Sequence, residues 1–171
     1  MRNQTLLVFS KIAISVATTL AGYHLVTRYF HLNFVNGLSM QPSLMPSDTV
    51  LSRKIQPNKV KHGDIVVLYS PTEHNKLLVK RIIGLPGDQI MPRQDSRFWQ
   101  HHHNKEYLRV PSGHMWVEGD NSSTSLDSND YGMIPMALIQ SKVLLIEREF
   151  SFLLPNHTFT NGRLLLNQKR I

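Results

Sequence analysis

The chain has 171 residues, a formal net charge of +7 and no cysteine. This length fits one domain and is too short for two substantial ones, and the absence of cysteine excludes disulfides and thiolate metal sites. The positive charge alone would suit nucleic-acid binding, but the basic residues are scattered and no aromatic platform is interleaved with them, so we expect no nucleic-acid partner.

The first predicted element is a helical membrane anchor at residues 1–28. No acidic residue precedes Asp48, and the run from Leu6 to Val26 is largely apolar although it contains Lys11. As a helix this run would span about 31 Å, close to the ~30 Å hydrocarbon core of a bilayer. We expect an uncleaved transmembrane anchor, with a cleaved signal peptide and a mitochondrial presequence as alternatives. The positive charges of Arg2 and Lys11 would keep the N-terminus inside and the following domain on the far side of the membrane.

The rest of the chain, residues 29–171, is predicted to form a β-rich domain. Short β-rich runs alternate with turn residues such as those at Pro86-Gly87-Asp88. The predicted strands are Thr49–Arg53, Asp64–Tyr69, Leu77–Ile83, His114–Val117 and Val143–Ile146. Many short strands at this spacing predict a mainly β fold, an antiparallel sandwich or barrel.

The segment 91–106 differs in character from the predicted strands around it. It is polar, with Phe98-Trp99 embedded and the three histidines His101-His102-His103 near its end. Three adjacent histidines rarely point at one ion, so an exposed insertion is favoured over a metal site. We expect no metal.

Three short motifs carry the chemistry. They read Gly37-Leu38-Ser39-Met40-Gln41-Pro42-Ser43-Leu44, Leu78-Val79-Lys80-Arg81-Ile82-Ile83-Gly84-Leu85-Pro86-Gly87-Asp88 and Gly119-Asp120-Asn121-Ser122-Ser123-Thr124-Ser125-Leu126-Asp127-Ser128. Ser39 is a candidate nucleophile, although an isolated serine of this kind is more often an ordinary turn residue. A serine hydroxyl needs a base within hydrogen-bond reach.

Lys80 is the candidate base, provided that it is uncharged. Because side chains alternate along a strand, Lys80 shares its face with Leu78 and Ile82. Burial there would disfavour the ammonium form and lower the pKa of the lysine. The alternative is that Lys80 is exposed and Arg81 is buried, and periodicity alone does not choose between them.

The motifs resemble those of the type I signal peptidases. The segment Gly63-Asp64-Ile65-Val66 is similar to a fourth block of that family, and the four blocks occur in the family's order. The resemblance implies an antiparallel β signal-peptidase fold, peptidase activity without a cofactor, and an apolar rim that touches the bilayer. The residues proposed for this rim, with burial in the core as the alternative, are Phe30, Leu32, Phe34, Leu38 and Met45.

The resemblance also implies roles for single residues. Ser39 would be the nucleophile and its backbone N–H an oxyanion donor, while Lys80 would be the general base. Ser125 would orient Lys80, with Asp127 shaping the site beneath. Gly37 stands where some bacterial relatives have a serine that supplies a second oxyanion donor.

Within the family, the small size, the single anchor, the Asp127-Ser128-Asn129 ending and the run His114-Met115-Trp116-Val117-Glu118-Gly119-Asp120 resemble the mitochondrial inner membrane protease, and the second of its two subunits in particular. This implies location in the mitochondrial inner membrane with the catalytic domain facing the intermembrane space. It also implies a heterodimer with a second related catalytic subunit, and precursor proteins as substrates whose sorting signals are removed. Asn129 replaces the arginine typical of bacterial relatives and of the sister subunit, and so removes an expected ion pair with Asp127.

Two other functions fit the sequence less well. A non-catalytic subunit that stabilises its partner is disfavoured because Ser39, Lys80 and Ser125 are all present. A self-cleaving regulator with a related Ser/Lys dyad would need a DNA-binding helical domain, whereas the first 36 residues are apolar.

Overall fold

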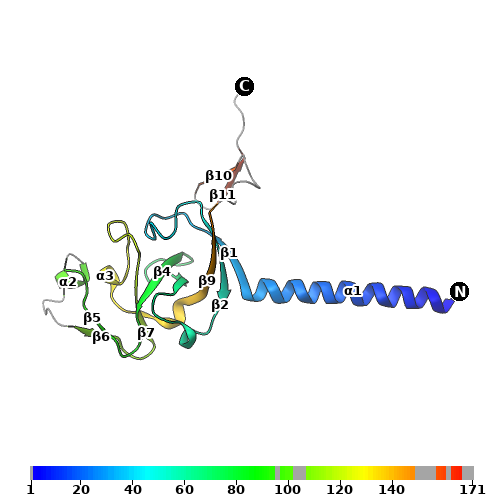
Figure 1. Cartoon of the computed structure of the whole chain (residues 1–171), viewed down its shortest axis with the longest axis horizontal. Coiled ribbons are helices and arrows are strands. Elements are labelled where there is room, and N and C mark those ends of the chain that lie inside the picture. The colour runs from blue at the N-terminus through cyan, green and yellow to red at the C-terminus, as the bar shows by residue number, and fades with distance from the viewer. Residues whose placement is uncertain (1, 95–96, 102–106, 149–156, 161–162, 167–171) are drawn as a thin grey trace, which may run out of the picture.

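The computed structural model describes residues 2–94, 97–101, 107–148, 157–160 and 163–166, in which a long N-terminal helix projects from a β domain (Figure 1). The main sheet has seven antiparallel strands in the order β1-β2-β9-β3-β4-β7-β8. Their bounds are Phe30–Phe34 for β1, Thr49–Lys54 for β2, Ile65–Tyr69 for β3, Leu77–Gly84 for β4, His114–Glu118 for β7, Ile134–Pro135 for β8 and Ile139–Glu147 for β9.

Smaller elements complete the described fold. β5 (Gln89–Ile90) pairs with β6 (Leu108–Arg109), and β10 (His157–Thr160) pairs with β11 (Arg163–Leu166). The short helices are α2 (Arg97–His101), α3 (Ser128–Tyr131) and the 3₁₀ turns η1 (Pro57–Lys59) and η2 (Met136–Leu138).

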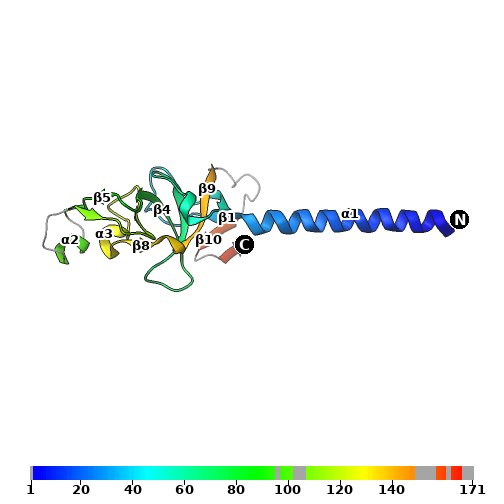
Figure 2. The same cartoon turned by 90° about the horizontal axis from the view of Figure 1, so that it is seen from below.

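The prediction of a mainly β, antiparallel fold is confirmed. All five predicted strands are present, and β9 begins four residues earlier than predicted. β1 was not predicted, because its apolar residues alternate with His31 and Asn33 in a run that directly continues the helix. Irregular register within the β2–β9, β3–β9 and β4–β7 pairs accompanies the curl of the sheet seen in Figure 2, since bulges bend and twist strands.

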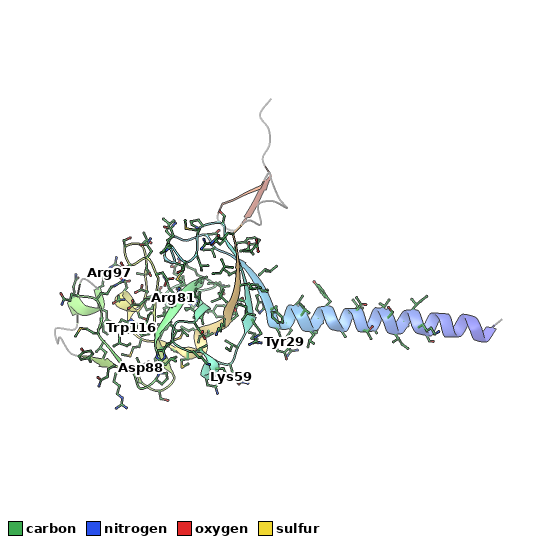
Figure 3. The ribbon with its side chains drawn as sticks, viewed as in Figure 1. Tyr29, Lys59, Arg81, Asp88, Arg97 and Trp116 are labelled. Atoms are coloured by element: carbon green, nitrogen blue, oxygen red, sulfur yellow. The ribbon has the colours of Figure 1, made fainter. Side chains whose placement is uncertain are left out.

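The N-terminal helix α1 extends over Arg2–Tyr29, as one continuous rod that ends at the junction with β1, where Tyr29 lies (Figure 3). Among the residues that the structure describes, no helix is both long and apolar enough to cross a membrane. The helix itself was predicted. Lys11 and several hydroxyl residues interrupt its apolar run, and the hydroxyls of Thr18 and Thr27 donate to backbone carbonyls of the preceding turn.

Two apolar clusters form the core of the described part of the chain. The larger contains Val66, Leu68, Ile82, Met115 and Val117, all 0% exposed, with further residues around them. The smaller is built from Val35, Met40, Leu44 and Val50.

The five residues proposed for the apolar rim are exposed to different degrees. Leu32 is 65% exposed and Phe30 is 37% exposed, with Phe34, Leu38 and Met45 between them. The alternative that these side chains form the core is therefore wrong.

Candidate active site

The Ser39 loop is held by the side chains on either side of the serine. Met40 and Leu44 are buried in the smaller core cluster, so Ser39 itself is left half-buried at the surface of the loop. The backbone N–H of Asn121 donates to the backbone oxygen of Ser39 at 2.9 Å, and its Nδ2 donates to the oxygen of Leu38 at 3.2 Å. The first and third motifs are therefore joined at the candidate nucleophile.

Lys80 lies near the middle of β4 and is only 2% exposed. Its Nζ donates a hydrogen bond to Ser125 Oγ at 2.8 Å. Burial lowers the pKa of Lys80 below the ordinary value, while the negative charges of Asp127 and Asp130 oppose this and the positive charge of Arg93 adds to it. The alternative in which Lys80 is the exposed residue of the strand is excluded.

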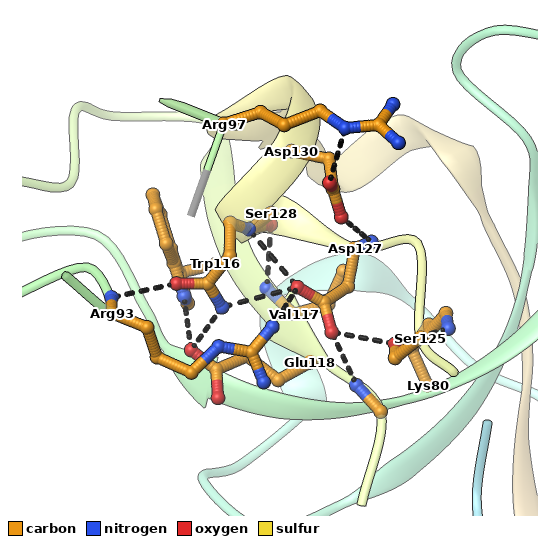
Figure 4. A network of polar contacts seen from close by, with 12 residues as sticks. Lys80, Arg93, Arg97, Trp116, Val117, Glu118, Ser125, Asp127, Ser128 and Asp130 are labelled. Atoms are coloured by element: carbon orange, nitrogen blue, oxygen red, sulfur yellow. Dashed lines mark hydrogen bonds and ion pairs between the residues drawn. The ribbon is translucent and has the colours of Figure 1, made fainter. Parts of the chain in front are cut away.

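Asp127 supports Ser125 from beneath and is fully buried. Its Oδ2 accepts from Ser125 Oγ at 2.5 Å and from the Gly119 N–H at 3.0 Å. Burial alone would raise the pKa of Asp127, but hydrogen bonds from Ser125, Gly119 and Asn129 outweigh burial and lower it. Lys80, Ser125 and Asp127 thus form a continuous hydrogen-bonded chain (Figure 4).

Gly119 is the point where this chain meets the Ser39 loop. A Cβ atom at position 119 would collide with Ser125 Oγ and with the backbone oxygen of Ser39, and would lie 2.7 Å from Ser125 Cβ. The absence of a side chain at Gly119 therefore allows the Ser39 backbone and the partner of Lys80 to be near neighbours. This role was missed in the sequence, where a glycine before an Asp-Asn pair suggests no more than a turn.

Arg81, the neighbour of Lys80, was also missed as a structural residue. Its Nε and Nη2 donate to the two oxygens of Asp120 at 2.8 and 2.6 Å, and its Nη1 donates to the oxygen of Gly63 at 2.9 Å. Nη2 also lies 3.2 Å from Ser43 Oγ. One guanidinium therefore ties together all four motifs, and the signal that could have revealed it is the strand alternation that places Arg81 opposite Lys80.

The third motif continues into α3, whose N-terminus is capped by Asp127. Its Oδ1 accepts from the Asn129 N–H at 3.0 Å, while Asp130 Oδ2 accepts from the Asp127 N–H at 3.0 Å, which is a reciprocal capping box. Ser128 Oγ accepts from the Val117 N–H at 3.0 Å and so joins α3 to β7. Asp127 thus serves both the helix and the candidate site.

Gly37, the proposed site of a missing second oxyanion donor, lies exposed before Ser39, and a Cβ atom there would meet nothing within 4 Å. The loop therefore has room for a side chain at this position.

Part of the predicted insertion at 91–106 packs on the domain. Phe98 contacts Trp116 edge to face, with ring centroids 5.9 Å apart, and its ring also covers Gly132. Phe98 is therefore half-buried, whereas Met91, Gln94, Arg97 and Gln100 of the same segment are exposed. His102 and His103 lie outside the described residues, and the described residues contain no group of three metal-ligating side chains.

The sequence matches one protein family. The profile described as "Signal peptidase, peptidase S26" matches residues 8–98 and 91–146.

Individual relatives are subunits of a mitochondrial protease. Mitochondrial inner membrane protease subunit 1 of Schizosaccharomyces pombe is 37% identical over 139 residues, which are 78% of this chain and 84% of the relative. Subunit 1 of Homo sapiens is 38% identical over 63% of each chain, and subunit 2 of Mus musculus is 40% identical over 63% of this chain and 61% of the relative. The human and mouse matches thus span less than two thirds of those relatives. The predicted resemblance to this protease is confirmed, and both of its subunits appear among the relatives.

A crystal structure of a signal peptidase I from Enterococcus faecalis V583 also matches, with 26% identity and a TM-score of 0.40. The match covers 51% of this chain and 97% of that chain.

Proposed function

Because the chain belongs to the signal peptidase family, peptidase S26, we propose that it is a serine endopeptidase with Ser39 as nucleophile and Lys80 as general base. One observation carries the proposal: the buried amine of Lys80 lies 2.8 Å from Ser125 Oγ, which in turn lies beside the Ser39 backbone at Gly119. Burial favours the uncharged amine that general-base catalysis requires.

The proposed reaction begins when the neutral Nζ of Lys80 takes the proton from Ser39 Oγ as Oγ bonds to the scissile carbonyl carbon. The Ser39 N–H stabilises the resulting oxyanion. The ammonium of Lys80 then returns the proton to the leaving nitrogen, and the C–N bond breaks to give an ester on Ser39. Lys80 then takes a proton from a water molecule as the water oxygen bonds to the ester carbon. The ammonium returns that proton to Ser39 Oγ as the C–O bond breaks, which releases the carboxylic acid product and restores Ser39 and neutral Lys80.

Ser125 and Asp127, the other members of the hydrogen-bonded chain, act on Lys80 and not on the substrate. Ser125 Oγ accepts from Nζ and donates to Asp127, so it can fix the orientation of the amine through both ground state and reaction. Asp127 keeps this hydroxyl from rotating. Lys80 and Ser39 are the groups proposed to touch the reacting atoms.

The names of the relatives lead to a more specific proposal about place and substrate. We place the protein at the mitochondrial inner membrane with its β domain, residues 29–171, facing the intermembrane space. There it would remove sorting signals from proteins delivered to that space. It would act in a heterodimer with a second, related catalytic subunit.

The test is cleavage of a precursor carrying such a signal, by the complex whose partner subunit has lost its own nucleophile. We expect Ser39→Ala and Lys80→Met to abolish cleavage, because the first lacks the attacking oxygen and the second lacks the base. Lys54→Met, at an exposed position on β2, is the matched control and should cleave normally. Circular dichroism would verify that all variants are folded.

The alternative of a non-catalytic stabilising subunit gives the opposite result. The partner subunit would then lose stability when this chain is removed but would be indifferent to Ser39→Ala. Cleavage at an unchanged rate by folded Ser39→Ala protein, with the partner inactive, would contradict the proposed nucleophile.

A further inference from the structure

Asp127 brings a negative charge into the interior next to Lys80, and nearby groups must compensate this charge. It is 0% exposed, and Ser125, Gly119 and Asn129 are neutral hydrogen-bond donors to it. A cation also approaches: Arg93 Nη2 lies 3.5 Å from Asp127 Oδ1. A buried carboxylate is costly unless it is paired, so this arginine matters more than an ordinary surface charge.

The segment that carries Arg93 is attached to the third motif by its backbone. The Arg93 N–H donates to Asn129 Oδ1 at 2.8 Å, and Asn129 Nδ2 donates to Glu118 Oε1 at 2.9 Å and to Asp127 Oδ1 at 3.1 Å. The neighbouring Pro92 is buried. The arginine is therefore directed at Asp127 by contacts on both its backbone and its side chain (Figure 4).

We propose that Arg93 is a positioning residue of the catalytic apparatus, which balances the charge of Asp127 so that the Asp127–Ser125–Lys80 chain holds an uncharged lysine. Asn129 supplies no charge but holds the Arg93 backbone in place. The catalytic meaning of this arrangement rests on the proposed function, whereas the electrostatic effect on Lys80 does not.

The charges around Lys80 give the direction of the effect. Burial lowers the pKa of Lys80, Asp127 and Asp130 act to raise it, and Arg93 acts to lower it. The other charges nearby have partners of their own. Asp130 faces Arg97 at 3.7 Å, and Arg81 is paired with Asp120. Glu118 accepts hydrogen bonds from Trp116 and Asn129. Removing Arg93 would leave two carboxylates acting on Lys80 with less opposition, so its pKa would rise.

The sign of the pH effect follows from this. Below its pKa Lys80 is an ammonium and cannot take the serine proton. A higher pKa therefore moves the acid limb of the kcat/KM profile to higher pH. Activity lost at neutral pH should return as the pH is raised, which a distorted site would not show.

The test is Arg93→Met in the full-length chain within its complex, the partner's nucleophile being removed. Methionine keeps much of the length of the side chain and removes its charge. We expect kcat/KM at pH 7 to fall about tenfold, equivalent to about 1.4 kcal/mol of barrier, and the loss to shrink in alkaline buffer. Arg93→Lys should lose less, because the charge is retained without the planar fork. Arg109→Met, an exposed arginine on the neighbouring strand β6, is the matched control and should leave the profile unchanged.

A second measurement does not depend on activity. NMR titration of ¹³C-labelled lysines, with Lys80→Met to identify the Lys80 signal, should show a higher Lys80 pKa in Arg93→Met and an unchanged one in Arg109→Met. An unchanged Lys80 pKa in folded Arg93→Met protein would overturn the inference. If the pKa rises as expected but the wild-type chain cleaves nothing, the inference on Arg93 stands and the proposed function fails.

Discussion

Burying a lysine amine lowers the stability of the folded chain, and at Lys80 this cost depends on pH. The folded-state pKa of Lys80 is lowered by burial, so at a pH between the folded and unfolded values the unfolded chain holds a proton that the folded chain lacks. The free energy of unfolding must then rise with pH in that range.

We expect Lys80→Met to be more stable than wild type at neutral pH, since methionine can occupy the same interior without a proton to lose. The difference should shrink as the pH approaches ~10.4, the ordinary lysine value. Urea titrations of both proteins between neutral and alkaline pH would measure it. A difference in stability that is the same at every pH would contradict a lowered pKa of Lys80 in the folded chain.

Gly119 and Gly37 differ in the space around them, so the same substitution to alanine can be compared at both positions. Gly119→Ala should cost about 1–3 kcal/mol of stability and reduce kcat by on the order of 100-fold, because the new methyl group must displace Ser125 Oγ or the Ser39 backbone. Gly37→Ala, with open space around it, should stay within about 0.5 kcal/mol of wild type. Chemical denaturation and peptide cleavage would test the pair, and equal effects at the two positions would contradict the close approach at Gly119.

The candidate site shows what could and could not be predicted from residues alone. The sequence motifs predicted that Lys80 and Ser125 lie together, and the hydrogen bond between them is present. Gly119 and Arg93 were not assigned roles, since both depend on close approaches in space between segments distant in the chain. Periodicity also did not decide between Lys80 and Arg81, because both faces of β4 pack against apolar residues.

At the scale of elements, β4, the Ser39 loop and the third motif are held together by the Arg81 guanidinium. Breaking it should loosen several segments at once, because Arg81 reaches Asp120, Gly63 and Ser43. Arg81→Met should cost about 1.5–3 kcal/mol, the range for hydrogen bonds to charged groups. It should lower activity without moving the pH limb that Lys80 controls.

A double-mutant cycle with Asp120→Asn measures this contact. We expect the two substitutions to be non-additive, since they remove the same bidentate pair. Strict additivity of the unfolding free energies would show that Arg81 and Asp120 do not stabilise the fold through each other.

Strand order and short helices were the parts of the fold that sequence patterns could not supply. The long β9 lies between β2 and β3, which are consecutive in the chain, so hairpin reasoning would place the strands wrongly. α3 has only four residues, and its Asp127 cap is visible mainly once the fold is known.

At the scale of the whole molecule, α1 and the β domain are nearly separate objects. The side chains described in α1, from Ser10 to Tyr29, are all exposed, and the helix projects away from the sheet (Figure 1). We expect the free energy of unfolding of a chain that starts at Tyr29 to differ by no more than about 0.5 kcal/mol from that of the full chain, which is the usual range for changes at the surface. Denaturant unfolding followed by tryptophan fluorescence is suitable, because Trp116 lies in the core. A large loss of stability would show that the helix supports the domain.

The pairing of β3 with β4 has a consequence for how the chain tolerates changes in length. Val66 pairs with Lys80, and Ile65 pairs with Arg81. Because Lys80 and Arg81 are consecutive residues of one strand, their side chains point to opposite faces of the sheet and have different roles. Inserting a single residue within β4 ahead of Lys80 would exchange the faces to which Lys80 and Arg81 point. A guanidinium, which cannot lose its proton, would then lie in the interior, and the lysine amine would face Asp120 in place of the two-pronged guanidinium. The connecting turn at 70–76 lies outside the paired residues of β3 and β4, so a change in its length leaves this alternation intact. We therefore expect a one-residue insertion before Leu77 to be tolerated better than one between Leu77 and Lys80.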